Sequence, residues 1–323
     1  IALIDSLIIQ PRETDVLHEP LDLTEIKQAK YFVSSNDYTR DGKKPKGDLS
    51  GEIVKDINGN RYLKKGAPSL NGLLQEFLIS NYLATIAPDT QPNSLIMQEL
   101  KSDGSARFYT LSRIFDNTMD LEEFVRQPDW KEKLAKKPLY NFEVALAADH
   151  IFSKQQDMKL ANYIITEKPD GYYVASIDHE YAGDSVISFS NKMTFTTDIH
   201  RLTARVRDLH PKDELNHAGL AGDPRALEFI NEAKKHMKEE NILSFYRKLG
   251  RTDIQDLTKF VDCVSGANGL LSADNAKPYF ESIKAIHTTG IKFLHDVAAN
   301  QTFEKASVEA KNEDDKLEFV LNN

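Results

Sequence analysis

The chain has 323 residues and a formal net charge of −9, and its 40% hydrophobic and 28% charged residues are typical of a folded globular protein and exclude a disordered one. The single cysteine, Cys263, excludes an internal disulfide and a cysteine-based zinc cluster, and the negative charge argues against general nucleic-acid binding. No run reaches the roughly 18 apolar residues of a membrane-spanning helix, so we expect no transmembrane segment and a cytoplasmic protein.

Residues 50–115 have the pattern of a β-rich lobe with one helix. Alternating residues on both sides of Asn58-Gly59 predict a β-hairpin in "GEIVKDINGNRYLKKG". Apolar residues at helical spacing, followed by Pro88, predict a helix in "SLNGLLQEFLISNYLATI". A second hairpin is expected from "SLIMQEL" and "ARFYTLSRIF" on either side of "KSDG". The predicted order is therefore strand, strand, helix, strand, strand.

After Phe115 the pattern is mainly helical. Apolar residues three and four apart occur in "MDLEEFVRQ" and "LYNFEVALAADHIF", and helical spacing returns from Asp223 to about Ala299. One β-rich interruption pairs Tyr163–Ile165 with Tyr172–Ile177 across "TEKPDG", which predicts a third hairpin.

The predicted fold class is therefore α+β. We expect residues 1–115 to form an N-terminal extension and a β-rich lobe, residues 116–300 a helical lobe, and residues 301–323 a charged C-terminal segment. Two unlike lobes joined by an extended connector suit a phosphoryl-transfer enzyme, in which ATP lies between them. Such a reaction needs a group that orients the attacking hydroxyl, a divalent metal on the phosphates and fixed positive charge.

The stretch "QQDMKLANYII" places three polar groups in an otherwise apolar run. Asp157 could orient an acceptor hydroxyl, Lys159 could neutralise charge on the moving phosphoryl, and Asn162 could bind a metal through its amide oxygen. Asp178, at the end of the next predicted strand, is the candidate for the other metal ligand. The alternative is a solvated loop whose polar side chains cap neighbouring turns.

These residues carry a resemblance to a known family. Gln155–Asn162 resembles the protein-kinase catalytic loop, in which Asp, Lys and Asn have the same spacing, and Ile177–Glu180 resembles the Asp-Phe-Gly segment that binds metal. The resemblance implies a two-lobed protein-kinase-like fold that uses ATP with Mg²⁺ or Mn²⁺.

The same resemblance assigns residues in the β-rich lobe. Lys65 would contact the α- and β-phosphates, and Glu76 on the predicted helix would be its partner. Lys64 remains the alternative to Lys65. Strand alternation puts Leu63 on the same side as Lys65, where an apolar side chain could pack against adenine.

The chain departs from the family pattern at several places. Gln155-Gln156 replaces the usual His-Arg, and His179-Glu180 replaces Phe-Gly, although Glu180 could be a further metal ligand. The glycine-rich loop is reduced to Gly47 and Gly51, which are assigned to nucleotide binding. The overall pattern is similar to that of remote, atypical kinases that Legionella-type bacteria inject into host cells, which would place this protein in the host cytosol.

The acceptor is open to more than one interpretation. "IDHEYAG" also resembles a run in aminoglycoside and choline kinases, whereas Lys159 is typical of Ser/Thr protein kinases and favours a protein substrate. The sequence also leaves open a pseudokinase that only binds nucleotide and an enzyme that transfers a nucleotidyl group. The favoured prediction is an ATP-dependent kinase of protein Ser or Thr residues.

A basic segment follows the predicted metal loop. "HRLTARVRDLHPK" contains Arg201, Arg205, Arg207 and Lys212, and the first two would project from one face of a helix. We interpret the segment as a binding site for an anionic activator such as a phosphorylated residue, an inositol polyphosphate or a phosphoinositide headgroup. The alternative is a solvated basic helix balanced by nearby acids.

Overall fold

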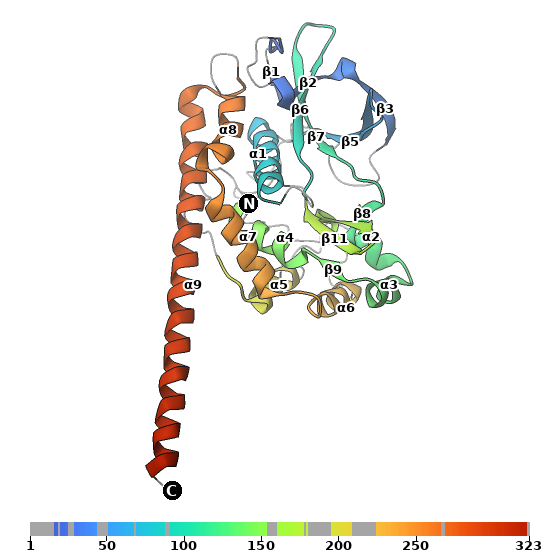
Figure 1. Cartoon of the computed structure of the whole chain (residues 1–323). Coiled ribbons are helices and arrows are strands. Elements are labelled where there is room, and N and C mark those ends of the chain that lie inside the picture. The colour runs from blue at the N-terminus through green and yellow to red at the C-terminus, as the bar shows by residue number, and fades with distance from the viewer. Residues whose placement is uncertain are drawn as a thin grey trace, which may run out of the picture.

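The protein forms two lobes and a long C-terminal helix that lies beside both (Figure 1). The computed structural model describes residues 16–18, 20–24, 29–43, 51–67, 69–87, 91–153, 160–177, 179, 195–208, 224–265 and 269–321. The predicted α+β class is confirmed, with a curled sheet in the N-terminal half and a mainly helical C-terminal part.

A curled sheet of seven strands makes up most of the first lobe as far as the structure describes it. Its order is β2-β6-β7-β5-β4-β3, and β1 pairs with β7 outside this path. The strands are β1 (Val16–His18), β2 (Phe32–Ser34), β3 (Tyr38–Lys43), β4 (Gly51–Asp56), β5 (Arg61–Lys65), β6 (Ser94–Leu100) and β7 (Ala106–Arg113). All neighbours are antiparallel except β2 and β6.

Both hairpins predicted in this lobe are confirmed. β4 and β5 join at Asn58-Gly59, where Gly59 has a φ of +81° that a residue with a side chain rarely adopts. β6 and β7 form the second hairpin. The prediction that the β-rich part begins near Ser50 is wrong, because β1, β2 and β3 precede it. β3 is a polar edge strand without hydrophobic alternation, so its sequence gives no strand signal.

The predicted helix of this lobe is α1 (Leu70–Ile86), which begins where the Ser69 side chain accepts a hydrogen bond from the Gly72 N–H at 3.1 Å. One side of α1 packs on the sheet, and another packs against α8 (Ile254–Val264). Phe260 of α8 contacts the ring of Phe77 with centroids 6.3 Å apart. α1 is therefore buried on nearly all sides.

The second lobe is built from helices around a small sheet. Its helices are α2 (Leu121–Arg126), α3 (Trp130–Lys136), α4 (Phe142–Ala148), α5 (Ile199–Asp208), α6 (Pro224–Ala233) and α7 (Glu239–Arg251). The strand order of the sheet is β8-β10-β11-β9, from β8 (Thr118–Asp120), β9 (Leu139–Tyr140), β10 (Tyr163–Lys168) and β11 (Gly171–Ser176). β10 and β11 are the third predicted hairpin, in register from Tyr163 with Ser176 to Lys168 with Gly171.

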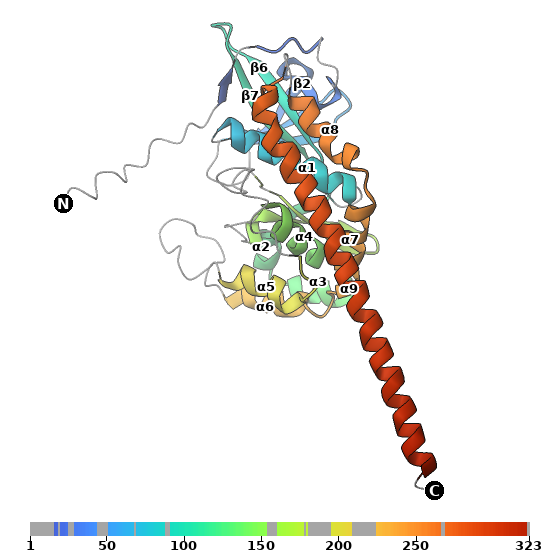
Figure 2. The ribbon, with the colours of Figure 1, turned by 90° about the vertical axis from the view of Figure 1, so that its left-hand side faces the viewer.

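Helix α9 (Ala273–Leu321) runs along both lobes and continues past the second one (Figure 2). In the first lobe its Tyr279 hydroxyl donates a hydrogen bond to Asn71 Oδ1 of α1. In the second lobe its Phe293 stacks on Phe195 with ring centroids 5.7 Å apart. Gly290 makes this approach possible, because a Cβ there would lie 3.2 Å from the Phe195 ring. No helix in the described ranges is both long and apolar enough to cross a membrane.

Candidate functional site

Adjacent lysines at the end of β5 lie on opposite faces of the sheet. Lys65 pairs with Thr110 of β7, on the face that packs against α1, and is only 6% exposed. The Lys64 Nζ lies on the other face, 3.0 Å from Glu52 Oε1 and 2.7 Å from Glu99 Oε2. Burial lowers the pKa of Lys64, but hydrogen bonds to the two glutamates outweigh it, so the pKa is raised. Lys64 is thus a charged group satisfied within the sheet.

The face that carries Lys65 also has an apolar surface. Leu63 lies on it by strand alternation, and Ile53 of β4 is directly opposite Leu63 across the hairpin. Both side chains are partly buried. Gly51, assigned to nucleotide binding, pairs with Lys65 at the start of β4. Ile53 was missed by the sequence analysis, although the hairpin turn at Asn58-Gly59 fixes the register that puts it opposite Leu63.

Glu76 connects α1 to the segment in which Asp178 was predicted to bind metal. Its side chain is 4% exposed, and Oε2 accepts a hydrogen bond from the backbone N–H of His179. The two residues are 103 positions apart in the sequence. A charged acceptor makes this a strong type of hydrogen bond, and it ties the helix of the first lobe to the chain just after Asp178.

Asn162 lies next to the same segment. It ends the short helical turn Leu160–Asn162 and is 4% exposed. Its backbone carbonyl accepts a hydrogen bond from the Ile177 N–H at 2.9 Å. The hairpin of β10 and β11 therefore brings Asn162 beside the residue that precedes Asp178. An amide oxygen is a ligand type that suits Mg²⁺ and Mn²⁺, so this residue fits the predicted metal role.

Several predicted site residues lie outside the described residues: Gly47, Asp157, Lys159, Asp178, Glu180 and Lys212. The same holds for the side chains of Arg205 and Arg207, of which the structure describes only the backbone within α5. Arg201 is exposed in the first turn of α5, where its N–H donates to Asp198 Oδ1 at 3.2 Å. The helix predicted for the basic segment is thereby confirmed as far as Asp208.

A buried polar cluster lies beside these segments and was missed by the sequence analysis. Asp149 follows α4 with no exposed surface, and its Oδ1 accepts a hydrogen bond from the Ser176 hydroxyl at 2.5 Å. Burial raises the pKa of Asp149 to about 6, while His179, the hydrogen bond from Ser176 and the Tyr163 hydroxyl oppose the rise. Asp149 occurs in an apolar helical pattern, so nothing local distinguishes it.

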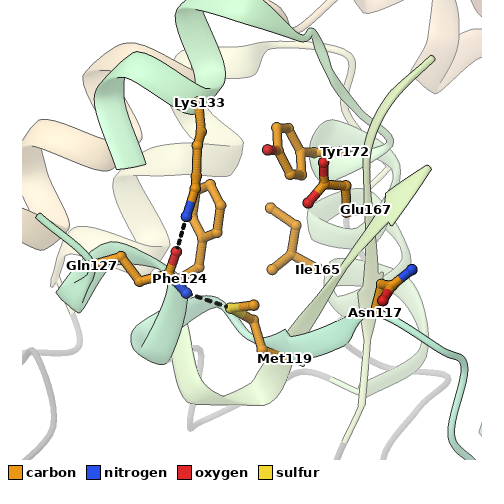
Figure 3. A pocket seen from close by; sticks show the side chains of 8 residues that line it. All are labelled: Asn117, Met119, Phe124, Gln127, Lys133, Ile165, Glu167 and Tyr172. Carbon is orange, nitrogen blue, oxygen red and sulfur yellow. Dashed lines mark hydrogen bonds between the residues drawn. The ribbon is translucent and has the colours of Figure 1, made fainter. Parts of the chain in front are cut away.

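A separate pocket lies within the second lobe, between α2, α3 and the small sheet (Figure 3). It is small, with a cavity volume of about 20 Å³, and is lined by Asn117, Met119, Phe124, Gln127, Lys133, Ile165, Glu167 and Tyr172. Gln127 lines one side of the pocket, where its Oε1 lies 2.5 Å from Lys133 Nζ and its Nε2 lies 3.0 Å from Met119 Sδ. None of the predicted site residues lines this pocket, so it is distinct from the site around Lys65 and Asn162.

No protein-family model and no curated protein sequence matches the chain. Among solved structures it is similar to the Helicobacter pylori proinflammatory kinase CtkA, with a TM-score of 0.43, 13% identity, and 81% of this chain and 98% of that chain covered. It is also similar to WaaP in complex with acyl carrier protein, with a TM-score of 0.30, 16% identity, and 62% and 90% covered. Because both TM-scores lie below 0.5, neither likeness carries a functional argument for this chain.

Proposed function

We propose that the protein is an ATP-dependent phosphotransferase. The observation that supports this most directly is the hydrogen bond from the His179 N–H to Glu76. It joins the helix that packs on the Lys65 face of the sheet to the segment that follows Asp178. A buried lysine on the sheet face that α1 covers, a buried carboxylate on α1 and a buried amide beside Ile177 thus come from distant parts of the chain, and groups of these types suit the binding of a metal-nucleotide.

In this proposal the first lobe binds the nucleotide. Lys65 contacts the α- and β-phosphates, and Glu76 orients Lys65. Ile53 and Leu63 pack against adenine, because an apolar surface beside a cation suits a flat base with a charged tail. Gly47 and Gly51 leave room for the phosphates to approach the backbone.

The second lobe supplies the groups that act on the reacting atoms. Asp157 orients the acceptor hydroxyl and accepts its proton, and Lys159 offsets negative charge on the transferred phosphoryl. Asn162 and Asp178 hold Mg²⁺ or Mn²⁺, with Glu180 as a further candidate ligand. When bound, the metal neutralises charge on the phosphate oxygens.

We further propose that the acceptor is a Ser or Thr hydroxyl of a protein, because Lys159 has the position typical of protein kinases. The resemblance to injected bacterial kinases supports action in the cytosol of a host cell. An anionic activator bound at Arg201, Arg205, Arg207 and Lys212 would complete the site, and the exposure of Arg201 supports that part of the proposal.

ATP labelled separately at its α- and γ-phosphates tests the proposal. The protein is incubated with each label and Mg²⁺ or Mn²⁺, in the presence of mixed protein substrates, aminoglycosides or choline, with and without an inositol polyphosphate. We expect γ-label on protein. Label from the α-phosphate would indicate nucleotidyl transfer, and γ-label on the small molecules would correct the acceptor. Nucleotide binding without transfer would indicate a pseudokinase, and absence of both would overturn the proposal.

A further inference from the structure

The chain leaves α4 through an unusual turn. Asp149–Ser153 forms a π-helical turn directly after α4, four residues before Asp157 in the sequence. Such wide turns are rare, and they occur often at functional sites because they redirect a side chain that a regular helix would place elsewhere. Here the first residue of the turn is Asp149, whose carboxylate points into the interior against β11.

Asp149 lies where three chain segments meet. Ser176, which donates a hydrogen bond to it, is two residues before Asp178. Tyr163, which directly follows Asn162, pairs with Ser176 in the hairpin, and its hydroxyl lowers the pKa of the carboxylate. His179 directly follows Asp178, is 1% exposed, and interacts with Asp149 electrostatically. Asp149 therefore binds the end of β11 just before Asp178, and its pKa responds to residues that follow Asp178 and Asn162.

The environment of Asp149 is costly for a carboxylate. A fully buried acid persists only where hydrogen bonds or opposite charge compensate its lost hydration. The Ser176 hydroxyl supplies a hydrogen bond, and His179 and the Tyr163 hydroxyl lower the pKa of the carboxylate against the effect of burial. The backbone of His179 in turn donates to Glu76 of α1. One hydrogen bond thus joins α1 to His179, and another joins Asp149 to Ser176, three residues before His179 in the sequence.

We propose that Asp149 is a positioning residue of the phosphoryl-transfer site: by binding Ser176 at the end of β11, two residues before Asp178, it fixes the strand that leads into the metal-binding segment. Asp149 touches neither nucleotide nor acceptor in this role. The resemblance to protein kinases puts a phenylalanine at the position of His179, so a buried imidazole here replaces an apolar ring. The inference rests on the proposed function, and it adds a residue outside the known motif.

The test compares Asp149→Asn with Glu143→Gln in the full chain. Glu143 is a matched control, because it is a buried acid on α4 that accepts hydrogen bonds from Lys238 and Asn241, away from the site. Mn²⁺ binding is measured by calorimetry with a non-hydrolysable ATP analogue present, beside the melting temperature and the split between kcat and KM. We expect Asp149→Asn to weaken Mn²⁺ binding about 10- to 100-fold, the effect usual for residues that orient metal ligands.

Glu143→Gln is expected to bind Mn²⁺ as the unmodified chain does. Equal Mn²⁺ affinity of the unmodified chain and a folded Asp149→Asn would overturn the inference alone, as would equal weakening by Glu143→Gln. If the unmodified chain binds no Mn²⁺ with the analogue, the proposed function and the inference both fail. Should Asp149→Asn not fold, Ser176→Ala removes one hydrogen bond and keeps the carboxylate. Weaker Mn²⁺ binding by this variant supports the inference, and unchanged binding overturns it.

Discussion

The two faces of the N-terminal sheet give lysine side chains different surroundings. On one face Lys64 binds Glu52 and Glu99 and covers the ring of Tyr109 at 4.2 Å. On the other face Lys65 is nearly inaccessible and lies on the side where α1 carries the buried Glu76. Lys64 is therefore paired within the sheet, whereas Lys65 lies on the face covered by α1, whose Glu76 joins the first lobe to His179.

Substituting each lysine in turn gives the largest expected difference. Lys65→Met should lower kcat/KM for phosphoryl transfer about 10²- to 10³-fold, because it removes a fixed charge from the phosphates. Lys64→Met should change kcat/KM by no more than a few-fold. Steady-state transfer from γ-labelled ATP measures both, and circular dichroism checks that each variant is folded. A larger loss in Lys64→Met would reverse the assignment of the two faces.

The Lys65 face depends on α1, and α8 covers the far side of α1. Phe260 of α8 is 3% exposed and contacts the rings of Tyr31, Phe77 and Tyr82. Phe260→Ala should therefore lower the free energy of unfolding by about 3 to 5 kcal/mol. Gln255→Ala, at an exposed position of the same helix, should change it by less than about 0.5 kcal/mol. Urea unfolding compares the two, and similar values would show that α8 does not stabilise this region.

The contributions of Asp149 and Glu99 to the free energy of unfolding should depend on pH in opposite directions. Asp149 has its pKa raised to about 6 in the folded protein, so its contribution to stability is fully present below about pH 3.8 and is lost as the pH rises through 6. Above pH 7 the loss is about 3 kcal/mol. For Glu99, burial raises the pKa, but the hydrogen bond and charge of Lys64, together with Tyr109 and Arg107, outweigh burial and lower the pKa overall. The contribution of Glu99 to stability is therefore present at neutral pH and lost on acidification.

Unfolding free energies between pH 4 and pH 8 measure this contrast. The unmodified chain should lose stability relative to Asp149→Asn as the pH rises, and gain it relative to Glu99→Gln. Parallel curves for the unmodified chain and Asp149→Asn would contradict the raised pKa.

The smallest expected effect is that of Lys64 on stability. Its partners Glu52 and Glu99 have side chains 30% and 39% exposed, so water and salt screen the pairs. Lys64→Met should lower the free energy of unfolding by about 1 kcal/mol or less, and by less still at high salt. Thermal unfolding at low and high sodium chloride checks this. A loss that does not change with salt would indicate packing on Tyr109 rather than charge pairing.

The sequence predicts those parts of the fold that have strong local signals. Asn58-Gly59 specifies the turn between β4 and β5, and apolar spacing specifies α1. The strands β1, β2 and β3 were missed, because pairing with β7, β6 and β4 rather than local pattern makes them strands. The packing of α8 and α9 against α1 was also missed, since contacts between residues nearly two hundred positions apart leave no local pattern in the sequence.

The candidate site shows the same limit. Lys65, Glu76 and Asn162 were predicted from spacing, and the structure gives each a buried position. Asp149 was not predicted, because its importance comes from Ser176, 27 positions away. The predicted helix also gave no sign of the π-helical turn that directs its carboxylate inward.

A crystal structure with Mn²⁺ and a non-hydrolysable ATP analogue tests the central claim most directly. We expect the triphosphate against Lys65, the base against Ile53 and Leu63, and an anomalous manganese peak at Asn162 and Asp178. A nucleotide bound elsewhere, or a manganese ion away from both of these side chains, would contradict the assignment of this face of the sheet to ATP.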